Sequence, residues 1–246
     1  MKFPAGKIIA FEGLDNCFKE TNYKEFVNRL KSQCSNYENM IHTESFPRYG
    51  TQCCIGVEKW LDGSFDRHHM KAHPEAICNL YSLDRYSYWF ESVHGMQRNI
   101  DKLHDGDCFI FDRYNVSNAI YQPQVGDMPR VDDLLYDDYA WGIPAPDIVI
   151  WLRIRNFAKY EELLETKQNK DLNESDIDFM KKIWDRSEYA LFSDIFSKAG
   201  IDLRVIEILD DDGELKSKEQ LAIDVYHAVR NAINGSVERF GKPIIF

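Results

Sequence analysis

The chain lacks an excess of basic residues: 30 Lys and Arg stand against 41 Asp and Glu in 246 residues, a net charge of −11. A general nucleic-acid-binding protein needs surplus Lys and Arg to neutralise phosphates, so the composition argues against that class. A small anionic ligand is not excluded, because a few well-placed basic groups override the global field locally. No apolar run approaches the length of a membrane span, and no signal-peptide-like segment opens the chain. We therefore expect a soluble, cytoplasmic protein with no membrane partner.

Two kinds of motif are also missing. The six cysteines form no C-x-x-C pair and no Cys/His spacing typical of a metal site, which favours reduced intracellular thiols over disulfides. No G-x-G-x-x-G follows the first apolar run, which argues against a dehydrogenase-type dinucleotide site. What is present is an ordinary globular composition, with 44% hydrophobic and 29% charged residues.

Short apolar runs alternate with longer segments of helical periodicity. We expect strands at Lys7–Glu12, Cys108–Asp112, Asp147–Leu152 and Arg204–Ile208. We expect helices within Tyr23–Gln33, Glu75–Asn99, Glu174–Ala199 and Glu219–Ile233. Buried strands joined by helical crossovers indicate a parallel sheet covered on both faces. With no repeat and no linker, the pattern predicts one α/β domain over residues 1–246.

The segment after the first predicted strand, residues 13–21, reads GLDNCFKET. A P-loop is G-x-x-x-x-G-K-[ST] between a strand and a helix. Its backbone N–H groups cradle phosphates, its Lys reaches the outer phosphates and its hydroxyl binds Mg²⁺. The placement, Gly13 and Lys19 fit this pattern. Phe18 replaces the second glycine, Glu20 replaces the hydroxyl residue, and Thr21 comes one residue late.

Each departure has a physical consequence. A Cβ at Phe18 disfavours positive φ and hinders the close approach of a phosphate. Glu20 adds negative charge where phosphates would bind, although its carboxylate could itself ligate Mg²⁺. Taken alone, this segment is equally compatible with an ordinary strand-to-helix turn carrying a surface lysine.

Further segments, in a fixed order, carry a family resemblance. They are Phe11–Asp15 (FEGLD), Ser45–Arg48 (SFPR), Leu80–Arg85 (LYSLDR), Asp112–Tyr114 (DRY) and Gly142–Asp147 (GIPAPD). They resemble the P-loop entry, the Phe-Pro-x-Arg turn, the Leu-Phe-Ser-Ala-x-Arg helix, the Asp-Arg-Tyr motif and the Leu-Pro-x-Pro-Asp turn of P-loop nucleoside-monophosphate kinases of the thymidylate kinase family. The resemblance covers roughly residues 5 to 210. It implies a three-layer fold with a five-stranded parallel sheet wrapped by helices, transfer of the ATP γ-phosphoryl group to dTMP with Mg²⁺, and a homodimer.

The resemblance also implies an acceptor site. Arg48 would hold the acceptor phosphate, Tyr81 would stack on the pyrimidine, and Arg85 would donate to a base carbonyl. The side chains that would surround the sugar and base are Asp15, at the 3′-hydroxyl, with Ser117 and Tyr121. A helix N-cap for Asp15 and core packing for Tyr81 and Tyr121 remain alternatives. Asn118 stands where the family usually has a small residue, so thymine, uracil and modified pyrimidines all remain candidate bases.

On the donor side, Lys19, Asp112 and Arg113 would be catalytic, with Arg113 clamping phosphates. Asp112 and Glu20 are the expected Mg²⁺ ligands. The ATP-binding residues expected from the P-loop position are Gly13, Asn16, Cys17, Phe18, Lys19, Glu20 and Thr21.

The family's donor-side arginine has no counterpart here. Its P-loop place is Asn16, and the lid, at about residues 156–174, offers only Lys159, Lys167 and Lys170. A lysine neutralises charge but cannot bridge two oxygens in a plane, and losing an arginine finger costs on the order of 10³-fold in rate. Arg153 and Arg155 just before the lid are partial substitutes. Three functions therefore stay open: a working kinase, a non-catalytic nucleotide-binding pseudokinase, and a structural partner of an active paralogue.

Overall fold

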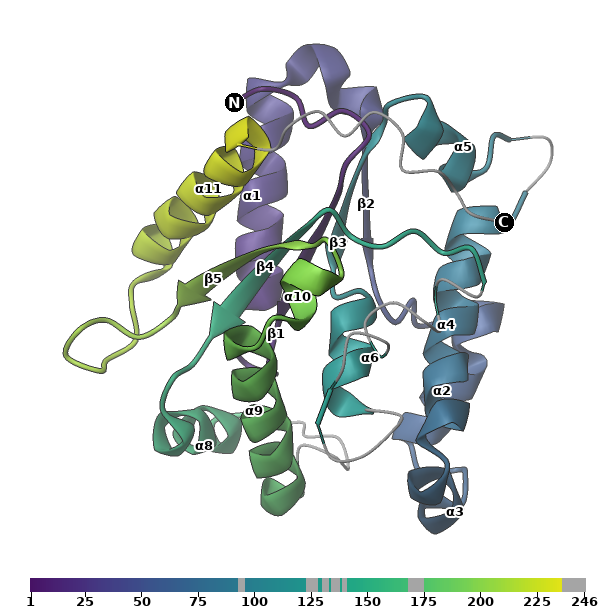
Figure 1. The fold of residues 1–246 in the computed structure, drawn as a ribbon, viewed down its shortest axis with the longest axis vertical. Coiled ribbons are helices and arrows are strands. Elements are labelled where there is room, and N and C mark those ends of the chain that lie inside the picture. Colours follow the sequence, from purple (N-terminus) through teal and green to yellow (C-terminus); the bar gives the residue numbers. More distant parts are fainter. Residues whose placement is uncertain are drawn as a thin grey trace.

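The computed structural model describes residues 1–92, 96–122, 128–129, 133, 138, 141–167 and 175–235, with the side chains of residues 67 and 71 left out. Its centre is one parallel sheet with the strand order β2-β3-β1-β4-β5 (Figure 1). The strands are β1 (Ile8–Gly13), β2 (Ile41–Ser45), β3 (Cys108–Asp112), β4 (Ile148–Arg153) and β5 (Asp202–Glu207). The predicted five-stranded parallel α/β fold is confirmed.

The central strands are apolar because both of their faces are covered. Every residue of β1 is buried, and β3 and β4 are buried up to their last residue. The edge strand β2 reads IHTES and buries only Ile41, so its own residues gave no strand signal. It pairs in register with β3, Ile41 opposite Cys108.

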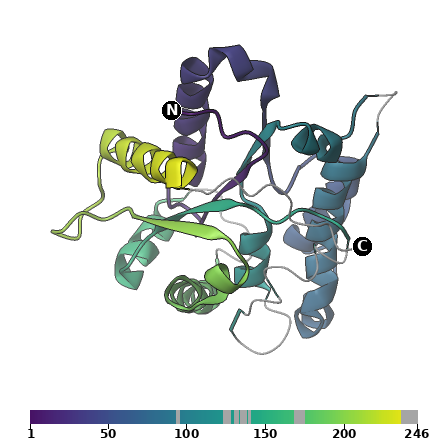
Figure 2. The same cartoon turned by 45° about the horizontal axis from the view of Figure 1, so that its top comes forward.

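Helices cover the two faces of the sheet. They are α1 (Lys19–Gln33), α2 (Ile55–Leu61), α3 (Arg67–Ala72), α4 (Pro74–Phe90), α5 (Asn99–His104), α6 (Asn115–Tyr121), α8 (Phe157–Glu165), α9 (Ile177–Phe192), α10 (Ile195–Lys198) and α11 (Lys218–Gly235). Figures 1 and 2 show α1 and α11 side by side on one face, with α4, α6 and α9 on the other. None of the helices in the described ranges is long and apolar enough to cross a bilayer.

Two predicted helices were too long. The helix expected over Glu75–Asn99 ends at Phe90, where Glu91 is extended, and α5 starts at Asn99. The residues that follow Glu91 in the sequence, Ser92 to Gly95, include no strong helix former, which favours a helix end before them. The helix expected from Glu174 begins only at Ile177, behind the capping carboxylate of Asp176.

An aromatic cluster fixes the elements that carry the site. Trp89 on α4 packs on Phe109 and Phe111 of β3, with ring centroids 4.8 and 5.8 Å away. The indole Nε1 of Trp89 donates to the Tyr114 hydroxyl at 2.7 Å, and that hydroxyl donates to the Pro144 carbonyl at 2.8 Å. This chain of contacts joins α4, the turn after β3 and the turn before β4.

Candidate active site

β1 runs directly through a loop, residues 13–18, into α1, which confirms the predicted strand–loop–helix order. Gly13 has φ 143°, and a Cβ there would lie 2.6 Å from the Leu152 carbonyl oxygen. Only glycine fits this close approach to β4. The nucleotide-binding loop expected from the sequence is therefore anchored at its first residue by the neighbouring strand.

The loop takes up left-handed backbone conformations without further glycines. Asn16 has φ 61°, and Phe18, the N-cap of α1, has φ 60°. The Cβ of Phe18 was expected to disfavour this conformation, at a cost of about 1–2 kcal/mol. The backbone adopts it nonetheless, and the Phe18 side chain packs against the hydrophobic core. Strain of this kind is retained where the surrounding structure imposes it.

Lys19 points back over this loop. Its Nζ donates to the Leu14 carbonyl oxygen at 2.5 Å, and the side chain is buried. Burial lowers the pKa of Lys19, and the nearby Arg113 lowers it further, while Asp15 opposes both. The lysine is thus a constrained cation whose contact with a carbonyl leaves it able to take a stronger, anionic partner.

A cavity of about 450 Å³ opens beside this loop, and we call it the donor cavity. Its lining residues are Asp15, Asn16, Phe18, Lys19, Glu20, Thr21, Asp112, Arg113, Leu163, Thr166 and Lys167. Of the expected ATP-binding residues, Gly13 and Cys17 do not line it, and Cys17 is fully buried. Asn16 Nδ2 donates to the Leu163 carbonyl at 3.0 Å, which ties the loop to α8.

The two expected Mg²⁺ ligands differ sharply. Asp112 Oδ1 is buried and has no hydrogen-bond partner among the described residues. Burial raises the pKa of Asp112, against the opposing charges of Lys19 and Arg113. The Glu20 carboxylate is 67% exposed and forms an ion pair with Lys24 at 2.5 Å. An unpartnered, buried carboxylate oxygen on the donor cavity fits a divalent cation, whereas Glu20 already has a cationic partner.

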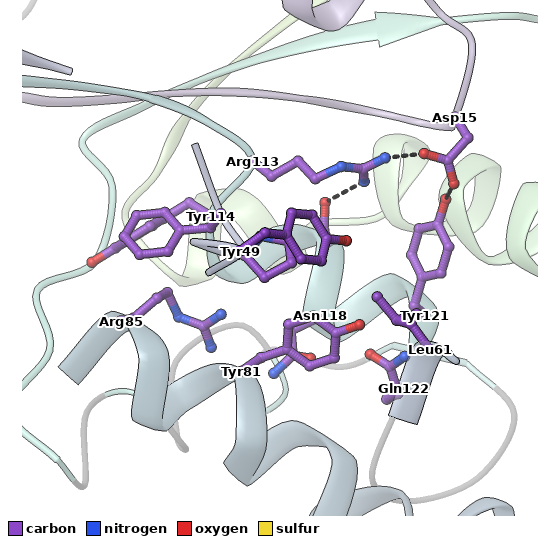
Figure 3. A pocket seen from close by; sticks show the side chains of 13 residues that line it. Asp15, Tyr49, Leu61, Tyr81, Arg85, Arg113, Tyr114, Asn118, Tyr121 and Gln122 are labelled. Carbon is purple, nitrogen blue, oxygen red and sulfur yellow. Dashed lines mark hydrogen bonds and ion pairs between the residues drawn. The ribbon is translucent and has the colours of Figure 1, made fainter. Parts of the chain in front are cut away.

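A second, smaller cavity of about 110 Å³ lies between α4, α6 and the turn after β2, and we call it the acceptor cavity. Its lining residues are Asp15, Phe46, Pro47, Tyr49, Leu61, Tyr81, Arg85, Arg113, Tyr114, Ser117, Asn118, Tyr121 and Gln122. Figure 3 shows Arg113, Asp15 and Tyr121 facing Tyr81 and Arg85 across it. The structure thus brings together every expected acceptor residue except Arg48.

Asp15 and Arg113 line both cavities. Arg113 Nη2 forms an ion pair with Asp15 Oδ1, and the Tyr121 hydroxyl donates to Asp15 Oδ2 at 2.7 Å. Burial acts to raise the pKa of Asp15, but Arg113, Lys19 and Tyr121 outweigh it and lower that pKa to about 2. Arg113 itself has φ 65°, so it is the third non-glycine residue with a left-handed backbone at the site, after Asn16 and Phe18.

Arg85 is held by a carboxylate that sequence reasoning missed. Its Nε lies 2.7 Å from Asp138 Oδ2 and its Nη2 lies 2.8 Å from Asp138 Oδ1. Ser82 Oγ donates to the same Oδ1 at 2.9 Å. Nothing in the sequence around Asp138 pointed to this partner. The remaining nitrogen, Nη1 of Arg85, has no hydrogen bond to a described residue.

Arg48 lines neither cavity, and its guanidinium is bound by Asp84 of α4. In Phe46-Pro47-Arg48-Tyr49 the arginine stands one place earlier than in the Phe-Pro-x-Arg pattern, and Tyr49 takes the fourth place. Tyr49 does line the acceptor cavity. Counting this spacing would have found Tyr49 from the sequence.

Asn118 is a buried amide on the wall of the acceptor cavity. Its Nδ2 donates weakly to the Cys78 carbonyl at 3.4 Å. Its Oδ1 is buried and accepts no hydrogen bond within the described part of the chain. Such an atom costs free energy unless a ligand or water reaches it.

The basic residues in and just before the expected lid differ in whether they line the donor cavity. Lys167 lines the donor cavity, whereas Lys159 forms ion pairs with Glu162 and Glu214, and Lys170 lies outside the described residues. Arg153 is bound by Glu188 and Glu207, and Arg155 donates to the Asp210 carbonyl. Neither arginine lines the donor or the acceptor cavity, and among the described lid residues Lys167 is the cation that lines the donor cavity.

Comparison with known proteins places this geometry in a family. The thymidylate kinase family profile matches residues 11–192. The chain is 30% identical over 152 residues to a probable thymidylate kinase of Methanococcus maripaludis strain C6, covering 60% of each chain. It is 24% identical over 188 residues to the thymidylate kinase of Rickettsia typhi, covering 74% of this chain and 82% of that one. The match thus spans only about 60% of the length of the archaeal relative.

Solved structures agree on the fold. Thymidylate kinase from Ehrlichia chaffeensis superposes with a TM-score of 0.58 at 15% identity, covering 91% of this chain and 98% of that one. Thymidylate kinase from Candida albicans superposes with a TM-score of 0.61 at 18% identity, covering 94% and 93%. The chain belongs to the thymidylate kinase family.

Proposed function

We propose that the chain transfers the γ-phosphoryl group of ATP to dTMP or a related pyrimidine deoxynucleoside monophosphate. One observation carries this proposal: the donor and acceptor cavities share Asp15 and Arg113. Phosphoryl transfer needs donor and acceptor oxygens in line, with cationic groups at the transferring group. A cationic side chain on the wall common to two cavities meets that need, and family membership supports the same reaction.

In the acceptor cavity we propose a role for each polar side chain. Tyr81 stacks on the pyrimidine, and Arg85, fixed by Asp138, donates from Nη1 to a base carbonyl. Asn118 Oδ1 accepts a hydrogen bond from the base. Its unpartnered state supports this contact.

The sugar lies toward the other end of the acceptor cavity. We assign the 3′-hydroxyl to Asp15, whose lowered pKa keeps it ionised and therefore an acceptor. Tyr121 and Ser117 complete the sugar wall. Arg48 reaches the acceptor phosphate only if it releases Asp84, whereas Arg113 already lines the cavity.

In the donor cavity the loop backbone, including Asn16 and Phe18, cradles the ATP phosphates. Lys19 moves from the Leu14 carbonyl to the outer phosphates, because a dianionic oxygen is a stronger partner than a carbonyl. Arg113 holds the transferring group, and Lys167 supplies positive charge in place of the arginine that the lid sequence lacks.

We propose that Asp112 holds Mg²⁺, through the buried Oδ1 that has no hydrogen-bond partner among the described residues. When bound there, Mg²⁺ would neutralise the negative charge that develops on the transferring phosphoryl group. Glu20 is a weaker candidate because it is exposed and bound to Lys24.

A nucleotide-binding pseudokinase remains the second candidate function, favoured by Glu20 at the hydroxyl position and by a lid without arginine in its described part. The retained left-handed loop at Asn16 and Phe18 favours the kinase, because a protein that binds only a monophosphate does not need it. The loop therefore departs from the P-loop pattern in the side chains at positions 18 and 20 more than in its backbone conformation.

Three further proposals concern the chain as a whole, and of these the homodimer rests on the resemblance. We propose one functional domain over residues 1–246 and a homodimer, for which the exposed apolar side chains of Leu83, Tyr86 and Trp141 offer a contact surface. The cysteines, all thiols in the structure, fit a reducing compartment such as the cytoplasm.

The decisive experiment is ADP release measured with ATP, Mg²⁺ and a panel of deoxynucleoside monophosphates. We expect turnover with dTMP or dUMP and little with purine monophosphates. Binding of dTMP by calorimetry without any ADP release would reject the kinase and leave the pseudokinase. The Lys19→Met variant is the control, and it should abolish turnover while keeping dTMP binding.

A further inference from the structure

Glu12, at the end of β1, is a fully buried carboxylate that lines neither cavity and has no role in the reaction proposed above. We propose that Glu12 is a positioning residue that orients Arg113 through the hydroxyl group of Ser117. The proposal rests on the proposed function for its kinetic consequence, and on geometry alone for the contact itself.

Three donors from one turn converge on Glu12. Its Oε1 accepts the backbone N–H of Tyr114 at 2.9 Å and that of Ser117 at 3.3 Å. Its Oε2 accepts the Ser117 hydroxyl at 2.5 Å. A strand residue thereby binds the N–H of the N-cap residue Tyr114 and the first-turn N–H of Ser117, at a helix start where the N-cap side chain makes no capping hydrogen bond.

The direction of the last bond matters. An ionised carboxylate only accepts, so the hydroxyl hydrogen of Ser117 must point to Glu12. The lone pairs of that hydroxyl then face Arg113, whose Nη1 donates to it at 3.2 Å. The pKa of Glu12 is raised, chiefly by burial, while the Ser117 hydroxyl, Arg113 and the backbone N–H groups of Tyr114 and Ser117 act to lower it. Three donors meet this carboxyl group, and a carboxylate is the form that accepts from all of them.

The result is a directed chain from Asp15 through Arg113 and Ser117 to Glu12. Both ends are carboxylates, so each hydrogen bond has one possible direction. Arg113 is therefore held at both terminal nitrogens, by Asp15 and by Ser117. Its left-handed backbone is held as well, because Glu12 binds the next N–H, that of Tyr114.

Such fixing matters for a residue on the wall of two cavities. A guanidinium that must meet a phosphoryl group in transit contributes most when its orientation is set before the reaction. Without Glu12 the Ser117 hydroxyl could turn its hydrogen toward Arg113 or the cavity. The guanidinium would then keep only the Asp15 contact.

The Glu12→Gln variant isolates this effect. The Gln oxygen keeps both backbone contacts, while its NH₂ group donates to Ser117 and forces the hydroxyl hydrogen elsewhere. We expect kcat to fall roughly 10-fold, within the 100-fold that a misplaced group can cost, with little change in the KM for dTMP. Glu25→Gln, an exposed substitution on α1, is the matched control and should leave both constants unchanged.

A double-mutant cycle separates positioning from general damage. Ser117→Ala breaks the same link without touching the buried carboxylate. If Glu12 acts through Ser117, the Glu12→Gln substitution should have almost no further effect on kcat in the Ser117→Ala background. Effects that multiply in the double variant would overturn the proposal.

A readout without turnover keeps the test independent of the proposed function. In ¹⁵N-arginine-labelled protein the two Nη signals of Arg113, assigned with Arg113→Lys, should be resolved because both nitrogens are held. Glu12→Gln and Ser117→Ala should each bring them toward averaging. If Glu12→Gln does not fold, Ser117→Ala alone provides the test. Unchanged Arg113 signals in Ser117→Ala would overturn the inference. A wild type with resolved signals but no ADP release would reject only the kinase.

Discussion

Arg48 and Asp84 form an ion pair that joins the turn after β2 to α4. Arg48 Nε lies 2.9 Å from Asp84 Oδ1, and the Arg48 backbone N–H donates to Oδ2 at 2.8 Å. Arg48 Nη2 also donates to the Asp84 carbonyl at 2.9 Å. The Asp84 side chain is only 1% exposed, so it depends on this arginine for its counter-charge. The arginine expected at the acceptor phosphate thus stabilises the wall of the acceptor cavity.

We predict that Arg48→Ala lowers the free energy of unfolding by about 3 kcal/mol, because it leaves a buried carboxylate unpaired. Denaturant unfolding measures this. Arg98→Ala breaks an exposed pair with Asp101 and is the control, with a much smaller expected loss. Unchanged stability together with weaker dTMP binding would instead support the role that the sequence resemblance gave to Arg48.

For Arg85 the expected effect is on binding. We predict that Arg85→Ala weakens deoxynucleoside monophosphate affinity by ~1–3 kcal/mol, the scale of a lost charged hydrogen bond. Calorimetry on folded protein gives the affinity. Because the substitution also leaves Asp138 unpaired, the double variant Arg85→Met with Asp138→Asn serves as the stability control. Undiminished affinity in either variant would remove Arg85 from the base site.

Features that depend on local pattern were predictable from the sequence. The apolar runs of β1, β3 and β4 and the loop around Gly13 follow from residue type and spacing alone. Most of the residues around the acceptor cavity were also predictable, because the family resemblance assigns them to motifs that occur in a known order along the chain.

Features that depend on distant partners were not. β2 is polar and becomes a strand only because β3 offers it an edge. Arg85 and Glu12 have partners 53 and 105 residues away, Asp138 and the Ser117 hydroxyl. No spacing rule connects such positions, so tertiary structure alone defines these contacts.

Asp15 should give the protein a specific pH dependence. Its pKa of about 2 in the folded state lies below the ordinary 3.8, so its stabilising contribution is present above pH 3.8 and is lost as the pH falls toward 2. The difference between these two pKa values corresponds to about 2 kcal/mol. The wild type should therefore lose its advantage over Asp15→Asn between these pH values. Urea unfolding of both proteins across that range measures the difference, and a difference that stays constant with pH would contradict the assignment.

Lys167 and Lys159 offer a matched pair of lid substitutions. Lys167 lines the donor cavity, while Lys159 is bound by Glu162 and Glu214. We predict that Lys167→Ala lowers kcat by roughly 10-fold to 100-fold, less than the ~10³-fold of a lost arginine finger, and that Lys159→Ala changes it little. Lys167→Arg should raise kcat, because a planar fork bridges two phosphate oxygens. Steady-state kinetics at saturating ATP measures kcat for each variant. Equal losses of kcat in the two alanine variants would contradict the assignment of Lys167 to the donor cavity.

Phe18 and Glu20, which depart from the P-loop pattern, are the positions at which a kinase and a pseudokinase can be distinguished by mutation. Phe18 already holds the left-handed conformation of a P-loop glycine, at a cost of about 1–2 kcal/mol. Phe18→Gly would release that strain and clear space for a phosphate, while losing the packing of the ring against the core. Glu20→Thr would remove a negative charge from the donor cavity and add a hydroxyl for Mg²⁺.

We predict that the double variant Phe18→Gly with Glu20→Thr binds ATP·Mg about 10-fold more tightly than the wild type, equivalent to about 1.4 kcal/mol. Turnover should rise less than affinity, because Asn16 and the lid lysine still neutralise the transferring group poorly. Measured at equal Mg²⁺, ATP affinity and dTMP-dependent ADP release give both quantities. Glu20→Gln removes the negative charge without adding a hydroxyl group, so it distinguishes the effect of the charge from that of the hydroxyl. If the double variant binds ATP·Mg more weakly than a wild type that already turns over, Glu20 must leave Lys24 and ligate the metal itself. The exposed ion pair between Glu20 and Lys24 would then exist only in the absence of ATP·Mg, and the loop would support catalysis despite its unusual sequence.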